Sequence, residues 1–242
     1  MIHTESIGAV ALLTIDRPEK RNALDIEHCE RLRRGLEAAL ADGARCAVIT
    51  GAGSAFCSGA DLGNVYGPEF RTALYGMLGA ITAAPVPVIA AVNGPAIGAG
   101  TQLAIACDLR VCASTARFGV PTAKLGLAVD PWTVRRLALL AGGGAARAML
   151  LGCDELYLDA AERIGLVDRH GDLDAAKAWA AAIAALAPLT LRYNKLALEA
   201  AFEAGPTDPA IDAAFEACWA SEDFVEGRAA GAEKRPPRFV GR

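Results

Sequence analysis

Apolar residues in the first half of the chain alternate between short continuous runs and segments with helical spacing. The runs at 9–15, 46–50 and 87–92 are typical of buried strands. Segment 25–40 carries apolar residues at intervals of three and four, which predicts a helix with Asp25 as its N-cap. Further helices are predicted around 68–83 and from about 98. Strands that alternate with helices predict an α/β chain with a mostly buried sheet.

Helical patterns dominate the chain from about residue 144 onward. Helices are predicted at 144–152, 159–164, 172–187, 189–203 and 208–219. Pro188 interrupts an alanine-rich segment, so one helix should end before it and another begin after it. The longest apolar run, 83–100, contains Pro85, Pro87 and Pro95, which predicts buried core rather than a membrane-spanning helix.

Composition and charge narrow the classes of partner. The 24 Lys and Arg residues against 28 Asp and Glu residues give a net charge of −4, and the basic residues are scattered, which argues against nucleic acid. The 7 cysteines include no CxxC and are interpreted as buried thiols in a reducing cytosol. The 3 histidines have no ligand spacing, so no metal site is expected. The N-terminus lacks the features of a secretion signal, and the cytoplasm is the expected compartment.

Two glycine-rich loops each follow a predicted strand, at 53–62 and 93–103. In the loop 53–62, small side chains leave backbone N–H groups accessible to a ligand. In the loop 93–103, small residues form the start of a predicted helix, whose first N–H groups lack intrahelical partners. Two such N–H groups converging on one carbonyl oxygen would form an oxyanion hole. The alternative is that both loops are tight turns whose small residues serve packing. Neither loop matches a dinucleotide or Walker fingerprint.

Four segments in order resemble a known family: SAFCSGADL, PVIAAVNGPAIGAGTQLAIACDLRV, ARFGVPTAKLGLAVD and EGRAAGAEKRPPRF. At matching separations they are similar to the enoyl-CoA hydratase/isomerase (crotonase) superfamily. The resemblance implies an α/β, ClpP-like spiral of ββα units over 1–188. It also implies a C-terminal helical region, 189–242, that forms homotrimers, often paired as a dimer of trimers. The implied ligand is a coenzyme A thioester, with no further cofactor.

The resemblance also assigns residues to the ligand. The oxyanion-hole donors would be the backbone N–H groups of Ala60 and Ala99. The adenine and pantetheine path would be lined by Arg21, Ala23, Leu24, Cys57, Ser58, Ala60 and Leu62. Cys57 is interpreted as a buried thiol rather than a nucleophile, because no histidine lies in a nearby motif.

Two positions depart from the family pattern. Gln102 and Thr122 stand where the family's hydratases carry two glutamates that move the protons of a water molecule. A carboxamide and a hydroxyl have no usable pKa near neutrality, so general acid–base catalysis is not available from them. Direct hydration of an enoyl-CoA is therefore disfavoured.

Asp130 and Trp132 follow in the segment GLAVDPW. Asp130 resembles the carboxylate that dienoyl-CoA isomerases place in a GLAxD segment, and alternatively it is the N-cap of a helix that begins near Trp132, with Pro131 at its first position. Trp132 would either narrow the acyl end of the pocket or pack in the core.

Three functional hypotheses follow. The first is a protein that binds fatty acyl-CoA thioesters in an oxyanion hole without efficient hydratase activity, as a carrier, sensor or feeder for lipid metabolism with a possible protein partner there. The second is an acyl-CoA isomerase, or another enolate-forming enzyme, that uses Asp130 as its proton shuttle. The third is a scaffold that binds a protein through its C-terminal helices.

Overall fold

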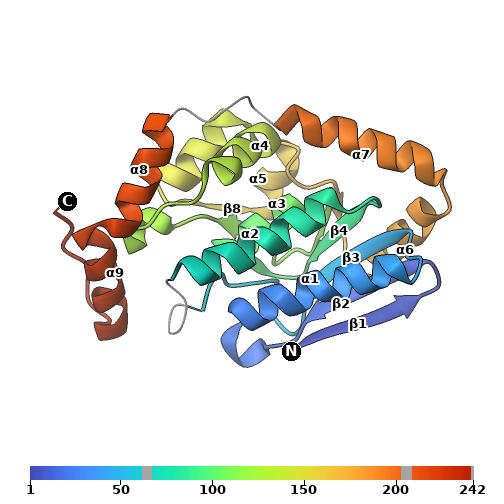
Figure 1. Cartoon of the computed structure of the whole chain (residues 1–242), viewed down its shortest axis with the longest axis horizontal. Coiled ribbons are helices and arrows are strands. Elements are labelled where there is room, and N and C mark those ends of the chain that lie inside the picture. The colour runs from blue at the N-terminus through green and yellow to red at the C-terminus, as the bar shows by residue number, and fades with distance from the viewer. Residues whose placement is uncertain (62–66, 203–208, 241–242) are drawn as a thin grey trace.

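The computed structural model describes residues 1–61, 67–202 and 209–240, and within them a larger and a smaller sheet form the core (Figure 1). The larger sheet has six strands in the order β1 (Ile2–Ile7), β2 (Val10–Ile15), β3 (Cys46–Gly51), β4 (Val88–Val92), β6 (Leu109–Cys112) and β9 (Arg169–His170). Only β1 and β2 pair antiparallel; the other neighbours are parallel. The smaller sheet joins β5 (Pro95–Ile97), β7 (Arg117–Gly119) and β8 (Glu155–Tyr157).

Helices cover both faces of the larger sheet at β2, β3 and β4, so these strands are apolar on both sides, whereas the edge strand β1 is largely exposed. On β2, Leu13 and Ile15 point to the core beneath α1 (Ile26–Ala41) and α2 (Pro68–Ala83), whereas Val10 and Leu12 point to α6 (Leu173–Ala184). The same alternation divides β3 and β4 between the two cores. Burial on both faces explains why these strands read as continuous apolar runs.

The strands and helices predicted in the first hundred residues are confirmed. The three apolar runs are β2, β3 and β4, and the segments 25–40 and 68–83 are α1 and α2. The Asp25 carboxylate caps α1 by accepting a hydrogen bond from the His28 backbone N–H at 2.9 Å. The helix expected from about 98 is α3 (Ala99–Ala106), which ends before β6. Strand β6 (Leu109–Cys112) was missed because it is short and carries Arg110 in its middle.

The second half is helical, as predicted, with two differences. Helix α4 (Pro131–Leu151) begins well before the predicted start at 144. Gly142 adopts a φ of 80° and kinks the helix, which continues on both sides of it, so the sequence pattern predicted only the second half. Helix α9 (Glu222–Glu233) was not predicted, since its glycines and charges weaken the apolar pattern. The other helices are α5 (Leu158–Arg163), α6, α7 (Pro188–Phe202) and α8 (Pro209–Ala220). No helix in the described ranges is long and apolar enough to cross a bilayer.

A buried lysine joins α7 to the core. Lys195 is only 6% exposed, and its Nζ lies 2.8 Å from an Asp108 carboxylate oxygen. The same ammonium donates to the backbone carbonyls of Ile81 and Val86 at 2.9 and 3.1 Å. Burial raises the pKa of Asp108, and the neighbouring ammonium opposes that rise. The three hydrogen bonds compensate for removing the lysine from water.

Lys195→Met is expected to destabilise the fold by about 3 kcal/mol, because it leaves the buried Asp108 carboxylate without its cationic partner and two carbonyls without their donor. Urea unfolding followed by circular dichroism measures the change. Lys177→Met is the matched control, since Lys177 pairs with exposed Asp174 on the surface of α6, and its unfolding midpoint should not move. Equal effects of the two substitutions would contradict the assignment of Lys195 as an anchor.

Candidate active site

The two glycine-rich loops lie directly against each other. Cys57 forms a β-bridge with Ala96 of β5: its N–H donates to the Pro95 carbonyl at 3.1 Å, and its carbonyl accepts from the Ile97 N–H at 2.9 Å. A second bridge joins Leu24 to Ala60. Because β5 leads into α3, these bridges hold the segment 57–60 beside the N-terminus of that helix.

Glycine is required where the two loops touch. A Cβ on Gly59, whose φ is 109°, would lie 2.9 Å from the Ile97 carbonyl oxygen and 3.8 Å from the Ala99 nitrogen. A Cβ on Gly100 would lie 2.1 Å from the Cys57 carbonyl oxygen, a distance that no packing adjustment of side chains relieves. These glycines therefore allow the backbones to approach closely enough for their N–H groups to share one ligand.

The backbone N–H groups of Ala60 and Ala99 have no hydrogen-bond acceptor among the described residues. The bridge to Leu24 uses the carbonyl of Gly59 and the N–H of Asp61, so the N–H of Ala60 points away from it. Ala99 is the first residue of α3, where an N–H has no intrahelical partner and lies at the positive end of the helix dipole. Both residues thus keep a donor for a ligand.

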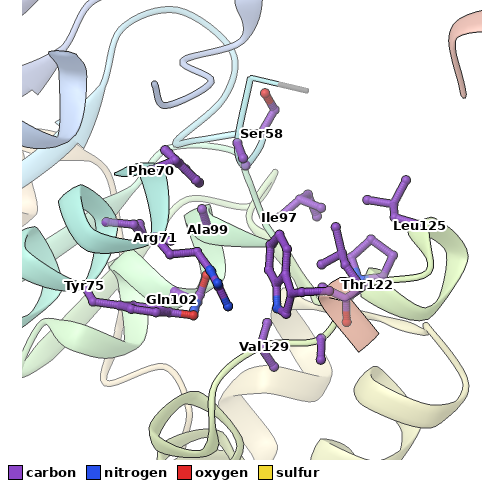
Figure 2. Close-up of a pocket in the computed structure, with 18 residues that line it drawn as sticks. Ser58, Phe70, Arg71, Tyr75, Ile97, Ala99, Gln102, Thr122, Leu125 and Val129 are labelled. Carbon is purple, nitrogen blue, oxygen red and sulfur yellow. The ribbon is translucent and has the colours of Figure 1, made fainter. Parts of the chain in front are cut away.

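A cavity of about 110 Å³ opens at these two residues, which is several times the roughly 10–15 Å³ that one water molecule needs (Figure 2). Its walls are mostly apolar. The lining residues are Ser58, Gly59, Ala60, Phe70, Arg71, Leu74, Tyr75, Ile97, Gly98, Ala99, Gln102, Pro121, Thr122, Leu125, Leu127, Ala128, Val129 and Trp219. Space and apolar walls suit a small acyl group beside the two N–H donors.

Gln102 and Thr122 line the same cavity, from different elements. Gln102 lies one turn into α3 and is 4% exposed. Thr122 begins the short 3₁₀ helix Thr122–Leu125 and is half-buried. The structure therefore brings together the two positions where the resemblance places hydratase acids, and neither side chain can carry a charge.

Asp130 is the N-cap of α4, as the capping alternative predicted. Its carboxylate accepts from the Thr133 backbone N–H at 3.1 Å and from the Thr133 hydroxyl at 2.6 Å. It also accepts from the Gln102 amide nitrogen at 3.2 Å. Asp130 does not line the cavity at Ala60 and Ala99 but an adjacent one. The Asp130 carboxylate thus holds the Gln102 amide through a hydrogen bond and does not itself reach the cavity at Ala60 and Ala99.

Trp132 lines that adjacent cavity and packs partly against the core. The Arg136 guanidinium lies 5.3 Å from the centre of its ring. The packing alternative is thus what the structure shows for Trp132, and the wall that it forms belongs to the adjacent cavity rather than to the one at Ala60 and Ala99. Tyr75 borders both cavities.

Several contributors to the site were not singled out from the sequence, among them Phe70, Arg71, Thr133 and Trp219. Arg71 reaches the cavity from α2, with Glu216 of α8 at 3.3 Å and the Trp219 ring at 4.8 Å. Burial and the nearby Asp130 carboxylate raise the pKa of the Tyr75 phenol, which therefore stays neutral. Only Thr133 left a signal in the sequence, the pattern of an N-cap followed three residues later by a polar residue in DPWT.

The residues expected along the coenzyme A path divide into three groups. Ser58 and Ala60 line the cavity, and the Ser58 hydroxyl donates to the Lys20 carbonyl at 3.1 Å. Arg21 is exposed, with a φ of 50°. Ala23, Leu24 and Cys57 are buried beneath the loops. Leu62 lies outside the described residues.

Cys57 is a buried thiol, as predicted, and burial raises its pKa to about 12. At pH 8 the thiol is therefore protonated and should not react with a disulfide reagent in the folded protein. Mass spectrometry of peptides after brief labelling checks this, and the same reaction in urea is the control that must label Cys57 fully. Rapid labelling of the native protein would contradict its assignment as structural.

Comparison with known proteins finds a matching family and relatives whose names refer to enoyl-CoA compounds. The family model described as Enoyl-CoA hydratase/isomerase matches residues 5–242. The chain is 45% identical over 242 residues to the probable enoyl-CoA hydratase echA6 of Mycobacterium tuberculosis, covering 100% of both chains. It is 37% identical over 250 residues to the crotonyl-CoA hydratase of Syntrophomonas wolfei, covering 96% of this chain and 94% of that one.

Solved structures agree on the architecture. A carnitinyl-CoA hydratase from Mycobacterium avium superposes with a TM-score of 0.84 at 33% identity, covering 100% of this chain and 98% of that chain. A methylmalonyl CoA decarboxylase gives a TM-score of 0.92 at 24% identity with the same coverage, a likeness of fold alone. The fold and the loop pair define a crotonase-type protein. The chain belongs to the enoyl-CoA hydratase/isomerase family.

Proposed function

We propose that the protein binds fatty acyl-CoA thioesters, with the acyl carbonyl held in an oxyanion hole formed by the N–H groups of Ala60 and Ala99, and that it hydrates enoyl-CoA poorly. One observation carries the proposal. Two backbone donors without acceptors open onto a cavity whose polar side chains at the hydratase positions, Gln102 and Thr122, cannot exchange protons.

The two donors act on the thioester carbonyl without any side chain. Both N–H groups polarise the carbonyl oxygen, and the dipole of α3 adds positive potential at Ala99. Hydration further requires a base to take a proton from water and an acid to deliver one to the carbon chain. The amide of Gln102 and the hydroxyl of Thr122 can position a water molecule but cannot take its proton. The site can therefore bind an acyl-CoA thioester while lacking the groups that hydration of an enoyl-CoA requires.

A role in fatty acid or lipid metabolism, as a carrier, sensor or feeder of acyl-CoA in the cytoplasm, fits this separation. The relatives are named as enoyl-CoA hydratases, which supports a coenzyme A thioester as ligand. Leu189 and Tyr193 on α7 are 78% and 69% exposed, which supports a homotrimer or a dimer of trimers through this region, or a protein partner from lipid metabolism there. Light scattering of the purified protein tests the assembly.

The competing function is an isomerase, or another enolate-forming enzyme, with Asp130 as the proton shuttle. Asp130 caps α4 and borders the adjacent cavity, so a shuttle would have to release its hydrogen bonds to Thr133 and Gln102. Asp130→Asn preserves the cap and distinguishes the two functions. If the enzyme hypothesis holds, turnover of an enoyl-CoA is lost while affinity stays nearly unchanged; if the binding hypothesis holds, there is no turnover to lose.

Calorimetry with saturated acyl-CoAs of increasing chain length, paired with a crotonyl-CoA hydration assay, tests the proposal. Saturable binding is expected together with a kcat far below the ordinary enzymatic range of roughly 1–10³ s⁻¹. A kcat within that range that is unchanged in Gln102→Ala would overturn it. Failure of every acyl-CoA to bind would overturn it as well and favour the scaffold hypothesis.

A further inference from the structure

The backbone on either side of Ala60 is held by a turn at residues 17–25. The Gly59 carbonyl accepts a hydrogen bond from the Leu24 N–H at 2.8 Å, and the Asp61 N–H donates to the Leu24 carbonyl at 2.8 Å. Both neighbours of Ala60 are therefore bonded to the same residue, and the N–H of Ala60 between them points the other way. The direction of that N–H depends on where Leu24 and Asp61 lie.

A single guanidinium joins Asp61 to the turn. Nη2 of Arg17 lies 2.7 Å from a carboxylate oxygen of Asp61, and the two side chains are only 16% and 6% exposed. Nη1 of Arg17 donates to the Ala23 carbonyl at 3.1 Å and to the Asp25 carboxylate at 3.2 Å. Hydrogen bonds between charged partners are short and strong, and removal from water strengthens them further. Arg17 thus ties the residue directly after Ala60 to the turn.

The turn is itself anchored by a buried asparagine. Nδ2 of Asn22 donates to the carbonyls of Ala52 and Ala55 at 2.8 and 2.7 Å, and its Oδ1 accepts from the Arg17 backbone N–H at 3.0 Å. Asn22 adopts a φ of 60°, a conformation that asparagine tolerates better than most residues. The backbone of Arg17 is therefore fixed, and its guanidinium reaches Asp61 from a rigid base.

We propose that Arg17, acting through Asp61, is a positioning residue for the N–H group of Ala60 and hence for a thioester carbonyl. The proposal rests on the proposed function, because it takes that carbonyl to be bound at Ala60 and Ala99. Arg17 is not among the residues that line the described cavity, so its effect passes through the backbone. The planar fork of a guanidinium can bond three acceptors at fixed angles, which suits this task.

Loss of Arg17 changes the charge balance at the turn. The carboxylates of Asp25 and Asp61 then lack the cation that joins them. Lys20 lies 3.8 Å from Asp61, but its side chain is 55% exposed and flexible, so its ammonium replaces the guanidinium poorly. A carboxylate that loses its partner turns toward water and displaces the backbone next to it. The N–H of Ala60 then leaves the direction in which it can donate to the carbonyl.

Calorimetry with butyryl-CoA and with S-butyl-CoA, the thioether in which a methylene replaces the carbonyl, tests the positioning role. The natural protein is expected to bind the thioester about tenfold or more tightly than the thioether. Arg17→Met is expected to lower this thioester-to-thioether ratio about threefold or more, since one of two donors is misplaced. A general loss of coenzyme A binding weakens both ligands equally and leaves the ratio unchanged.

Arg33→Met is the matched control, because Arg33 pairs with Glu37 at 2.9 Å on the outer surface of α1, and its ratio should equal that of the natural protein. Equal ratios in Arg17→Met and Arg33→Met would overturn the positioning role. A ratio of about 1 in the natural protein would mean that no carbonyl is held at Ala60 and Ala99, so that the proposed function itself has failed. A high natural ratio that ignores Arg17 removes only the present proposal.

A double-mutant cycle tests the route through Asp61. Asp61→Asn keeps the shape and the backbone bonds to Leu24 but removes the charge that Arg17 binds, so its ratio should fall as in Arg17→Met. The double variant should fall no further, because both changes break the same contact. Additive losses, or an unchanged ratio in Asp61→Asn, would overturn this route. Thermal unfolding verifies that the variants are folded, and Asp61→Asn alone decides the question if Arg17→Met does not fold.

Discussion

Ala99→Pro is expected to weaken acyl-CoA binding by about 10- to 100-fold while leaving the protein folded, because the thioester carbonyl loses one of its two donors. Ala99 occupies the first position of α3, where proline is favoured and where the N–H has no intrahelical role. The preceding residue is Gly98, with φ 55° and ψ −116°, and glycine tolerates this extended mirror-image conformation before proline. The ring also occupies the place of the ligand oxygen.

Ala99→Ser is the matched control, since it enlarges the side chain slightly and keeps the N–H group. Calorimetry with a saturated acyl-CoA measures both variants, and thermal unfolding verifies that both are folded. If Ala99→Pro binds as tightly as Ala99→Ser, the carbonyl is not held at the N-terminus of α3.

The triple variant Gln102→Glu, Thr122→Glu, Asp130→Asn is expected to hydrate crotonyl-CoA at least about 10²-fold faster than the natural protein. Two carboxyl groups then face the cavity from the positions where the family's hydratases carry them. Asp130 must be neutralised, because its carboxylate lies 3.2 Å from the Gln102 amide and would face a new charge. Asparagine keeps the helix cap.

The double variant that retains Asp130 separates charge from geometry. The carboxyl groups of the introduced glutamate and of Asp130 would lie so close together that both cannot ionise readily. One pKa of the pair therefore rises, and that proton is lost only at higher pH. The hydration rate of the double variant should therefore follow pH differently from that of the triple variant, as measured by the loss of enoyl absorbance. A triple variant that binds crotonyl-CoA but hydrates it no faster than the natural protein would show that missing acids are not the reason for low activity.

The sequence predicted most of the core for a simple physical reason. Strands buried on both faces, such as β3 and β4, are short apolar runs, and α1 shows both its cap and its spacing. Strand β6 was not predicted because it is only four residues long and Arg110 interrupts its apolar pattern. The kink at Gly142 hid the first half of α4.

The sequence predicted the parts of the site that depend on backbone N–H groups in glycine-rich loops, because such loops have a recognisable sequence pattern. The glycine loops predicted a pair of backbone donors, the family resemblance assigned them to Ala60 and Ala99, and the same resemblance marked Gln102 and Thr122 as departures. The contact between Gln102 and Asp130 joins residues far apart in the chain and left no local trace in the sequence, which left both the capping and the acid role of Asp130 open; the fold shows the cap. Arg71 and Trp219 come from helices whose patterns report only burial.

The most direct test of binding without reaction is a calorimetric titration of the natural protein with crotonyl-CoA. The heat of each injection is expected to decline and vanish once every chain is occupied, with crotonyl-CoA recovered unchanged afterwards. Constant heat at every injection, with 3-hydroxybutyryl-CoA recovered at the end, would mean that the protein is a working hydratase despite Gln102 and Thr122.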